Sequence, residues 1–182
     1  MLNRVLRGGL AALGCALGAA VLVVAIPAPH AAYPFAVSYR GDQAKLARLA
    51  PYPAVAPVGL PADWTAIGST LTSGGAAGAG TVTWALDFTT PDGMLASLEE
   101  TNAKATSFVR RMTNGGTVLL PAQPSPPRLG GRGWIFSATP ARGQRSLYAT
   151  SPAGFTVVVT GSATWAELRE LAASLRPVPP GR

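Results

Sequence analysis

The sequence has few of the residues from which catalytic and metal sites are usually built. Its 182 residues include one cysteine and one histidine, and only 13% of them are charged. Cys15 lies in an apolar segment near the N-terminus, and His30 follows that segment closely. The chain beyond His30 therefore has no disulfide, no thiolate or multi-histidine metal site and no Ser-His-Asp triad.

Lysine is also scarce, so the positive charge is carried almost entirely by arginine. The formal net charge is +7, and Lys45 and Lys104 are the only lysines. No dense basic run is interleaved with aromatic residues, as it would be on a nucleic-acid-binding surface. We expect no nucleic-acid partner. Arginines such as Arg110 and Arg111 instead favour anionic lipid head groups or cell-wall polymers.

One long apolar run is present, at residues 8–26, which are 19 residues without a charge. A helix of that length spans roughly 28 Å, close to the roughly 30 Å hydrocarbon core of a bilayer. Arg4 and Arg7 precede the run and favour a cytoplasmic N-terminus. We predict a cytoplasmic basic start at residues 1–7, a transmembrane helix at 8–26 that contacts the lipid bilayer, and the rest of the chain outside.

A cleaved signal peptide is the alternative interpretation, and it would make the protein secreted. The run exceeds the roughly 7–15 apolar residues usual in signal peptides, and Pro29 and His30 interrupt the small residues at which cleavage would occur. We therefore favour a retained anchor. Cys15 lies too early in the run for a lipoprotein signal and is interpreted as a small apolar residue in lipid.

We expect the segment Thr81–Thr101 to form the centre of the fold. Apolar residues alternate with polar or small ones, as in a half-buried strand. The apolar residues are Val82, Trp84, Leu86 and Phe88. The tripeptide Pro91-Asp92-Gly93 then has turn chemistry, since glycine accepts a positive φ. Met94, Ala96 and Leu98 share one face of the returning segment. We predict an antiparallel hairpin.

Three helices are predicted from caps and apolar faces. Asp42 would cap a helix at 43–50 with Leu46 and Leu49 facing inward, and Asn102 would cap one at 103–113. The third, at 165–175, begins with the capping box Thr164-x-x-Glu167. The remaining strands are predicted at 64–72, 117–120, 133–139, 146–150 and 155–161.

Strands joined by hairpins, rather than repeated βαβ units, indicate an α+β fold. We predict a single antiparallel sheet with the two main helices, 103–113 and 165–175, on one face. The extracytoplasmic domain would comprise residues 39–176, after a linker at 27–38 and before a short tail at 177–182.

Two groups of residues are candidates for catalysis outside the membrane. Thr101 and Lys104 fit a loose [ST]-x-x-K pattern, but the partner motifs of penicillin-interacting enzymes are missing, so we interpret them as a strand end and a solvated lysine. A carboxylate pair could come from Asp87, Asp92, Glu99 and Glu100. Asp92 is better explained by the turn, and Asp87 and Glu99 lie off the apolar faces, where we expect solvent. We assign no catalytic, cofactor-binding or metal residue.

Several segments resemble a known family in their order along the chain. They are P-x-x-L-P-x-x-W at 57–64, W-x-x-x-F-x-T-P-D-G at 84–93, LASLEE at 95–100 and FTVVVTGSATWAELRELAASL at 155–175. This arrangement resembles the actinobacterial membrane proteins of domain-of-unknown-function family 4245. The resemblance implies an actinobacterial cell-envelope protein and brings no activity or site residues with it.

Together these features predict a single-pass, membrane-anchored envelope protein that is not an enzyme. Its outer domain would bind an envelope protein, an anionic lipid or a cell-wall polymer, without a cofactor. The alternative is an extracytoplasmic hydrolase or transferase that uses the carboxylates or the hydroxyl–lysine pair. A cleft lined by Asp87, Glu99 or Lys104 would favour that alternative.

Overall fold

The computed structural model describes residues 36–74, 80–120 and 124–179. The predicted membrane helix at 8–26, the basic start at 1–7, Cys15 and His30 lie outside these residues. Within the described ranges, no helix has both the length and the apolar character needed to cross a bilayer.

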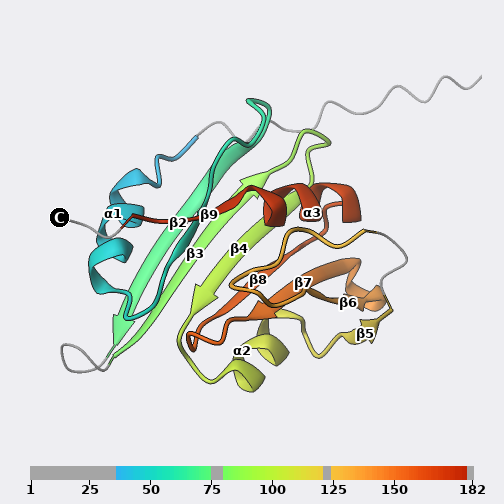
Figure 1. Ribbon diagram of the computed structural model, residues 1–182. Coiled ribbons are helices and arrows are strands. Elements are labelled where there is room, and N and C mark those ends of the chain that lie inside the picture. The colour runs from blue at the N-terminus through green and yellow to red at the C-terminus, as the bar shows by residue number, and fades with distance from the viewer. Residues whose placement is uncertain (1–35, 75–79, 121–123, 180–182) are drawn as a thin grey trace, which may run out of the picture. The chain divides into compact units, whose positions relative to one another are not determined.

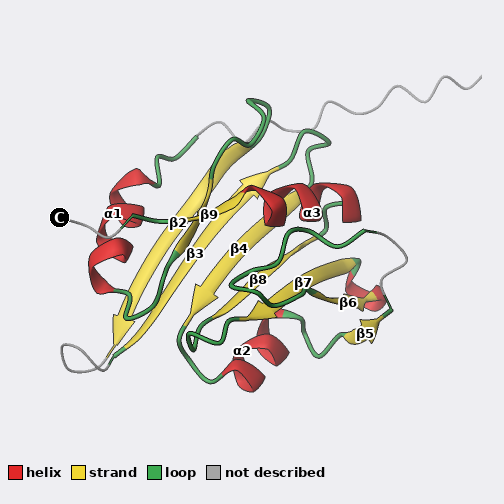
Figure 2. Cartoon of the chain, in the orientation of Figure 1, coloured by secondary structure: helices red, strands yellow, loops and turns green. Residues whose placement is uncertain are grey.

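The fold is α+β and is built on a seven-stranded sheet in which every neighbouring pair is antiparallel (Figures 1 and 2). The strand order is β2-β3-β4-β8-β7-β6-β5. The strands are β2 (Thr65–Gly74), β3 (Thr81–Thr89), β4 (Leu95–Thr101), β5 (Thr117–Leu119), β6 (Ile135–Thr139), β7 (Gln144–Thr150) and β8 (Thr156–Gly161).

The predicted central hairpin is confirmed as β3 and β4. The β3 residues Trp84 and Leu86 pair with Glu100 and Leu98 of β4. The turn closes with a 2.8 Å hydrogen bond from the Thr90 N–H to the Met94 carbonyl, and Gly93 has the expected positive φ of 72°. The turn residues and the alternation of apolar residues therefore predicted this hairpin correctly.

One face of the sheet, which we call the core face, carries the hydrophobic core. Trp84, Leu86 and Leu98 on this face are fully buried, and Val159 and Leu147 continue their row across β8 and β7. Helices α1 (Arg40–Leu49) and α3 (Trp165–Ser174) cover this face. They contribute Leu46, Leu168 and Leu171 to the same core.

Helix α3 starts as its capping box predicted. The Thr164 hydroxyl accepts a hydrogen bond from the Glu167 N–H at 3.3 Å, and the Thr164 N–H donates to Glu167 Oε2 at 2.8 Å. The box satisfies two amide donors that the first helical turn leaves unpaired.

The prediction of a single sheet was wrong. Strands β1 (Val55–Pro57) and β9 (Leu175–Pro177) form a second, two-stranded antiparallel sheet. Proline lacks an N–H, but Pro57 and Pro177 each end a strand, where a missing donor is tolerated. The helix predicted at 165–175 ends at Ser174 because the chain enters β9.

The prediction that both main helices lie on one face was also wrong. Helix α2 (Ala105–Met112) packs on the opposite face, which we call the α2 face, where Phe108 and Val158 are fully buried outside the main core. Val158 pairs with Glu99 and Tyr148, whose side chains leave the sheet away from the core. The sheet therefore has helices on both faces.

Two predicted helix caps are also corrected. Asp42 lies inside α1, where it accepts a hydrogen bond from the Ser69 hydroxyl at 2.8 Å, and Leu49 is 49% exposed rather than inward. Asn102 precedes α2, but its side chain instead accepts from the Val82 N–H at 2.8 Å. Both polar side chains form hydrogen bonds to strands of the sheet instead of capping a helix. Local sequence patterns do not show such contacts between distant residues.

Candidate ligand-binding site

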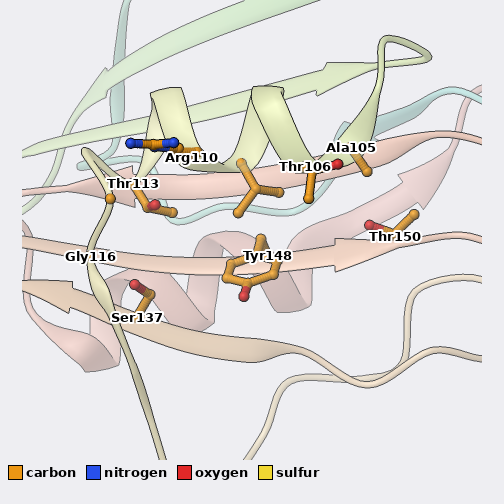
Figure 3. A pocket seen from close by; sticks show the side chains of 10 residues that line it. Ala105, Thr106, Arg110, Thr113, Gly116, Ser137, Tyr148 and Thr150 are labelled. Carbon is orange, nitrogen blue, oxygen red and sulfur yellow. The ribbon is translucent and has the colours of Figure 1, made fainter.

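A cavity of about 470 Å³ lies between α2 and the α2 face of strands β6 and β7 (Figure 3). Its volume is within the roughly 300–1,000 Å³ usual for small-molecule sites. Figure 3 shows residues of α2 above a floor that Ser137, Tyr148 and Thr150 form. The described residues that line the cavity are Ala105, Thr106, Val109, Arg110, Thr113, Gly115, Gly116, Ser137, Tyr148 and Thr150.

The end of α2 is fixed to the sheet by hydrogen bonds from two strands. Gln144 Nε2 donates to the Met112 carbonyl at 2.7 Å, and Thr139 Oγ1 donates to the Thr113 carbonyl at 2.7 Å. These bonds satisfy carbonyls that the end of a helix leaves unpaired. With Phe108 buried beneath the helix, they hold the wall of the cavity in place.

The chain then passes so close to β6 that only glycine fits. A Cβ atom at Gly116 would lie 2.6 Å from Thr139 Oγ1, 2.7 Å from Ser137 Oγ and 2.9 Å from the Ala138 carbonyl oxygen. All three distances are shorter than van der Waals contact. The absence of a side chain at Gly116 therefore lets the chain pack directly against Ser137 and Thr139 at this end of the cavity.

Ser137 lies in the floor of the cavity and carries a buried hydroxyl group. It is only 1% exposed, and its hydroxyl has no hydrogen-bond partner among the described residues. Ser146 pairs with it across β6 and β7, but the Ser146 hydroxyl is bonded to Thr160 Oγ1 at 2.7 Å. A buried polar group without a partner costs about 1–3 kcal/mol. The hydroxyl oxygen has almost no accessible surface, so it is packed beneath the floor and does not face the cavity.

Arg110 supplies the only charge in the lining, which contains no carboxylate. Figure 3 shows its side chain directed toward the end of the cavity where Thr113 and Gly116 lie. The neighbouring Arg111 is used differently, because its guanidinium lies 5.3 Å from the centre of the Phe108 ring. The cavity therefore favours a ligand with negative charge.

The floor continues into an exposed apolar edge. Ile135 pairs with Tyr148 and is 42% exposed, while Val118 pairs with Ser137 and is 61% exposed. Directly paired residues share a face of a sheet, so both side chains extend the floor on the side away from α2. We call Val118 and Ile135 the apolar edge.

Two other cavities have less of the character of a binding site. One, of about 500 Å³, lies between α3 and residues 124–127, beside the exposed Glu170. The other, of about 240 Å³, lies where β2 bulges between Ala66 and Gly68, and Asp87 and Ser97 line it. The Ser97 hydroxyl already donates to Asp87.

The predicted carboxylates fall into two groups. Asp87 and Glu99 lie on the α2 face, as alternation predicted, but Glu99 is half-buried rather than solvated. Burial, and then the charge of Asp87, raise the pKa of Glu99 to about 7, although Arg111 opposes the shift. Asp92 is exposed in the turn, as predicted.

Glu100 faces the core and is fully buried. Its Oε2 accepts a hydrogen bond from the Val55 N–H at 3.0 Å, while its Oε1 and the Tyr52 hydroxyl have no partner among the described residues. Burial raises the pKa of Glu100 to about 8. The carboxyl group joins β4 to β1 and does not line the cavity.

The proposed hydroxyl–lysine pair is not assembled. Thr101 Oγ1 donates to the Val82 carbonyl at 2.8 Å and accepts from the Ala103 N–H at 3.1 Å, whereas Lys104 is exposed at the start of α2. Among the residues that the structure describes, no cluster of three or more His, Cys, Asp or Glu side chains could hold a metal ion.

The comparison with protein families gives one clear match. The model of a family described as "Protein of unknown function (DUF4245)" matches residues 3–175. The chain belongs to this family. The match to DUF4245 covers the apolar run at 8–26, the sheet and the candidate site together. No curated protein and no solved structure matches the chain.

Sequence reasoning missed the cavity because its lining is made of ordinary strand and helix residues. One available signal was the run Val157-Val158-Val159, in which all three side chains are buried. A continuous apolar run in a strand indicates that both faces of the sheet are covered. The run therefore indicated that another element covers the α2 face.

Proposed function

We propose that this DUF4245 protein is a non-catalytic ligand-binding protein of the cell envelope. The α2 cavity is its binding site, and residues 8–26 anchor the domain at the outer face of the membrane. The observation that carries the proposal is the cavity of about 470 Å³ on the α2 face, which Arg110 and several hydroxyl-bearing residues line.

The other properties of the cavity support binding rather than chemistry. Its lining has no acidic residue, histidine or cysteine, and its hydroxyl groups come from Thr106, Thr113, Ser137, Tyr148 and Thr150. General acid–base catalysis most often uses a histidine or a carboxyl group within hydrogen-bond reach of the substrate, and the described lining has neither. This lining can hold and orient a small molecule.

The first experiment measures what co-purifies with the full chain. Wild-type protein, Thr106→Trp and Ser107→Trp are extracted from membranes, and the small molecules bound to each are quantified by mass spectrometry. Thr106 lines the cavity, whereas its exposed neighbour Ser107 does not, so the second substitution is a matched control.

We expect one molecule at close to equal stoichiometry with the wild type and with Ser107→Trp. Thr106→Trp should lower its amount at least about tenfold, because the indole fills the cavity. Equal amounts in all three proteins, or no bound molecule in any, would overturn the proposal.

The anchor is tested separately by protease treatment of intact spheroplasts. A retained anchor predicts full-length protein in the membrane fraction, with residues 39–176 digested from outside. A shorter protein in the medium would instead support signal cleavage and secretion.

A second candidate function, an extracytoplasmic hydrolase or transferase, rests on Asp87 and Glu99. A carboxyl group with a pKa of about 7 can exchange protons at neutral pH, and Asp87 lines a small cavity. A panel of nitrophenyl glycosides and esters tests it. Hydrolysis by the wild type that Glu99→Gln abolishes, while Asp92→Asn retains it, would favour an enzyme.

A further inference from the structure

We infer that the ligand of the α2 cavity is an anionic amphiphile: a carboxylate or phosphate head group joined to an aliphatic chain. This inference rests on the proposed binding function and specifies its ligand class. Three features carry it: the charge of the cavity, the apolar continuation of its floor, and the relative positions of the two.

The head group is assigned to the end of the cavity near Gly116. Arg110 is directed toward this end, where Thr113 also lines the cavity. A guanidinium and a hydroxyl can both donate hydrogen bonds to the oxygens of a carboxylate or phosphate. No ion pair of Arg110 with a described residue competes for this role.

The aliphatic chain is assigned to the remainder of the floor. It would lie against the Tyr148 ring, with Val109 and Ala105 of α2 on one side and the apolar edge on the other. Transfer of apolar surface out of water is favourable, and the exposed Ile135 and Val118 side chains would be covered together with the aliphatic chain.

Other ligand classes fit less well. A cell-wall sugar would leave the apolar edge exposed to water, and the positive charge of Arg110 would repel a cation. An extended peptide would need unpaired strand groups, but the cavity floor consists of β6 and β7, which are already paired on both sides. An amphiphile uses the charged and the apolar ends at once.

The test uses full-length protein in phosphatidylcholine nanodiscs and three photoreactive probes that carry a diazirine in the chain. The probes are hexadecanoic acid, the uncharged hexadecanol and phosphatidic acid. The acid tests a free ligand, phosphatidic acid tests a ligand held in the bilayer, and the alcohol controls for the chain alone. Cross-linked peptides are mapped by mass spectrometry.

We expect at least one anionic probe to label the peptide that contains Ile135 and Tyr148, and the alcohol to label it far less. Arg110→Gln should lower this labelling about tenfold, equivalent to about 1.4 kcal/mol. Arg111→Gln is the matched control and should retain it, because Arg111 lies over Phe108 outside the lining. Arg110→Lys should restore part of it.

Labelling that is equal for acid and alcohol, or unchanged by Arg110→Gln, would overturn the inference. The co-purified molecule separates this failure from that of the proposed function. If Thr106→Trp removes a bound molecule but Arg110→Gln does not, the cavity binds a ligand of a different class.

Discussion

The two faces of the sheet are covered in different ways. The core face is covered by α1, α3 and the small β1–β9 sheet, and its aromatic side chains form a network in which Trp64 and Tyr39 each lie within about 6 Å of the Phe88 ring. The α2 face is covered by one helix of eight residues, which one fully buried aromatic residue, Phe108, anchors.

The core face therefore provides most of the stability, and the α2 face provides the candidate binding site. The core face is continuous, whereas the α2 face combines an incomplete cover with a cavity of about 470 Å³ and an exposed apolar edge. Local openings of small free energy are drawn from such weakly packed regions. A protein that must admit a ligand gains from placing its site on the less covered face.

The largest expected effect is on the core face. Trp84 is fully buried, and its Nε1 donates to Ser69 Oγ at 3.2 Å. Trp84→Ala should lower the free energy of unfolding by about 4 kcal/mol, because it leaves a large cavity. Urea denaturation of the full chain measures this value. A loss below about 2 kcal/mol would show that the two faces are less different than their burial indicates.

Phe108→Ala tests the α2 face in the same way. It should cost about 3 kcal/mol or less, because α2 can detach while the core face stays intact. Hydrogen exchange should show amides of α2 losing protection, with β3 and β4 still protected. Uniform loss of protection over the whole domain would contradict this separation.

Glu100→Gln tests the buried carboxyl of the core face. A folded-state pKa of about 8, above the ordinary value of 4.5, means that the folded protein binds the proton more tightly than the unfolded chain does. The associated stability is present below about pH 4.5 and is lost as the pH rises toward 8.

Between pH 6 and pH 8 the wild type should therefore lose about 2 kcal/mol more than Glu100→Gln does. Urea denaturation at each pH measures both. Glu99→Gln is the control on the α2 face: it should retain the loss that Glu100 causes, and differ from the wild type mainly below pH 7, because the pKa of Glu99 is about 7. Parallel pH profiles for the wild type and Glu100→Gln would refute the assignment.

The smallest effect concerns the helix starts. Thr164→Ala should cost about 1 kcal/mol, because it removes the capping box of α3. Lys104→Ala at the start of α2 should change stability by less than about 0.5 kcal/mol, since no side chain caps that helix. Thermal unfolding compares the two, and equal losses would contradict the difference in capping.

Local signals predicted the elements better than their arrangement. The turn at Gly93, the alternation around Trp84 and the capping box at Thr164 each act within a few residues, and all three were confirmed. The position of α2 depends on which face Val158 presents, and Asn102 contacts the start of β3, far along the chain. Such tertiary contacts override local preference.

The site was harder to predict because it depends on contacts between segments that are distant in the sequence. Residues of α2 and of strands β6 and β7 line the cavity together. Arg110 and Arg111 are adjacent in sequence and identical in chemistry, yet only Arg110 lines the cavity, since helical geometry directs Arg111 to Phe108. Composition alone cannot distinguish them.

The pairing of β1 with β9 has a consequence for biosynthesis. Val55 faces Pro177, so a strand made early must wait for one of the last residues of the described chain before it gains a partner. Pairings of such long sequence separation form slowly, because the entropy of closing the loop is lost before the contact is made. A nascent chain would therefore leave the strand β1 without its partner until residues 175–177 have been made, which makes chaperone protection most valuable during that interval.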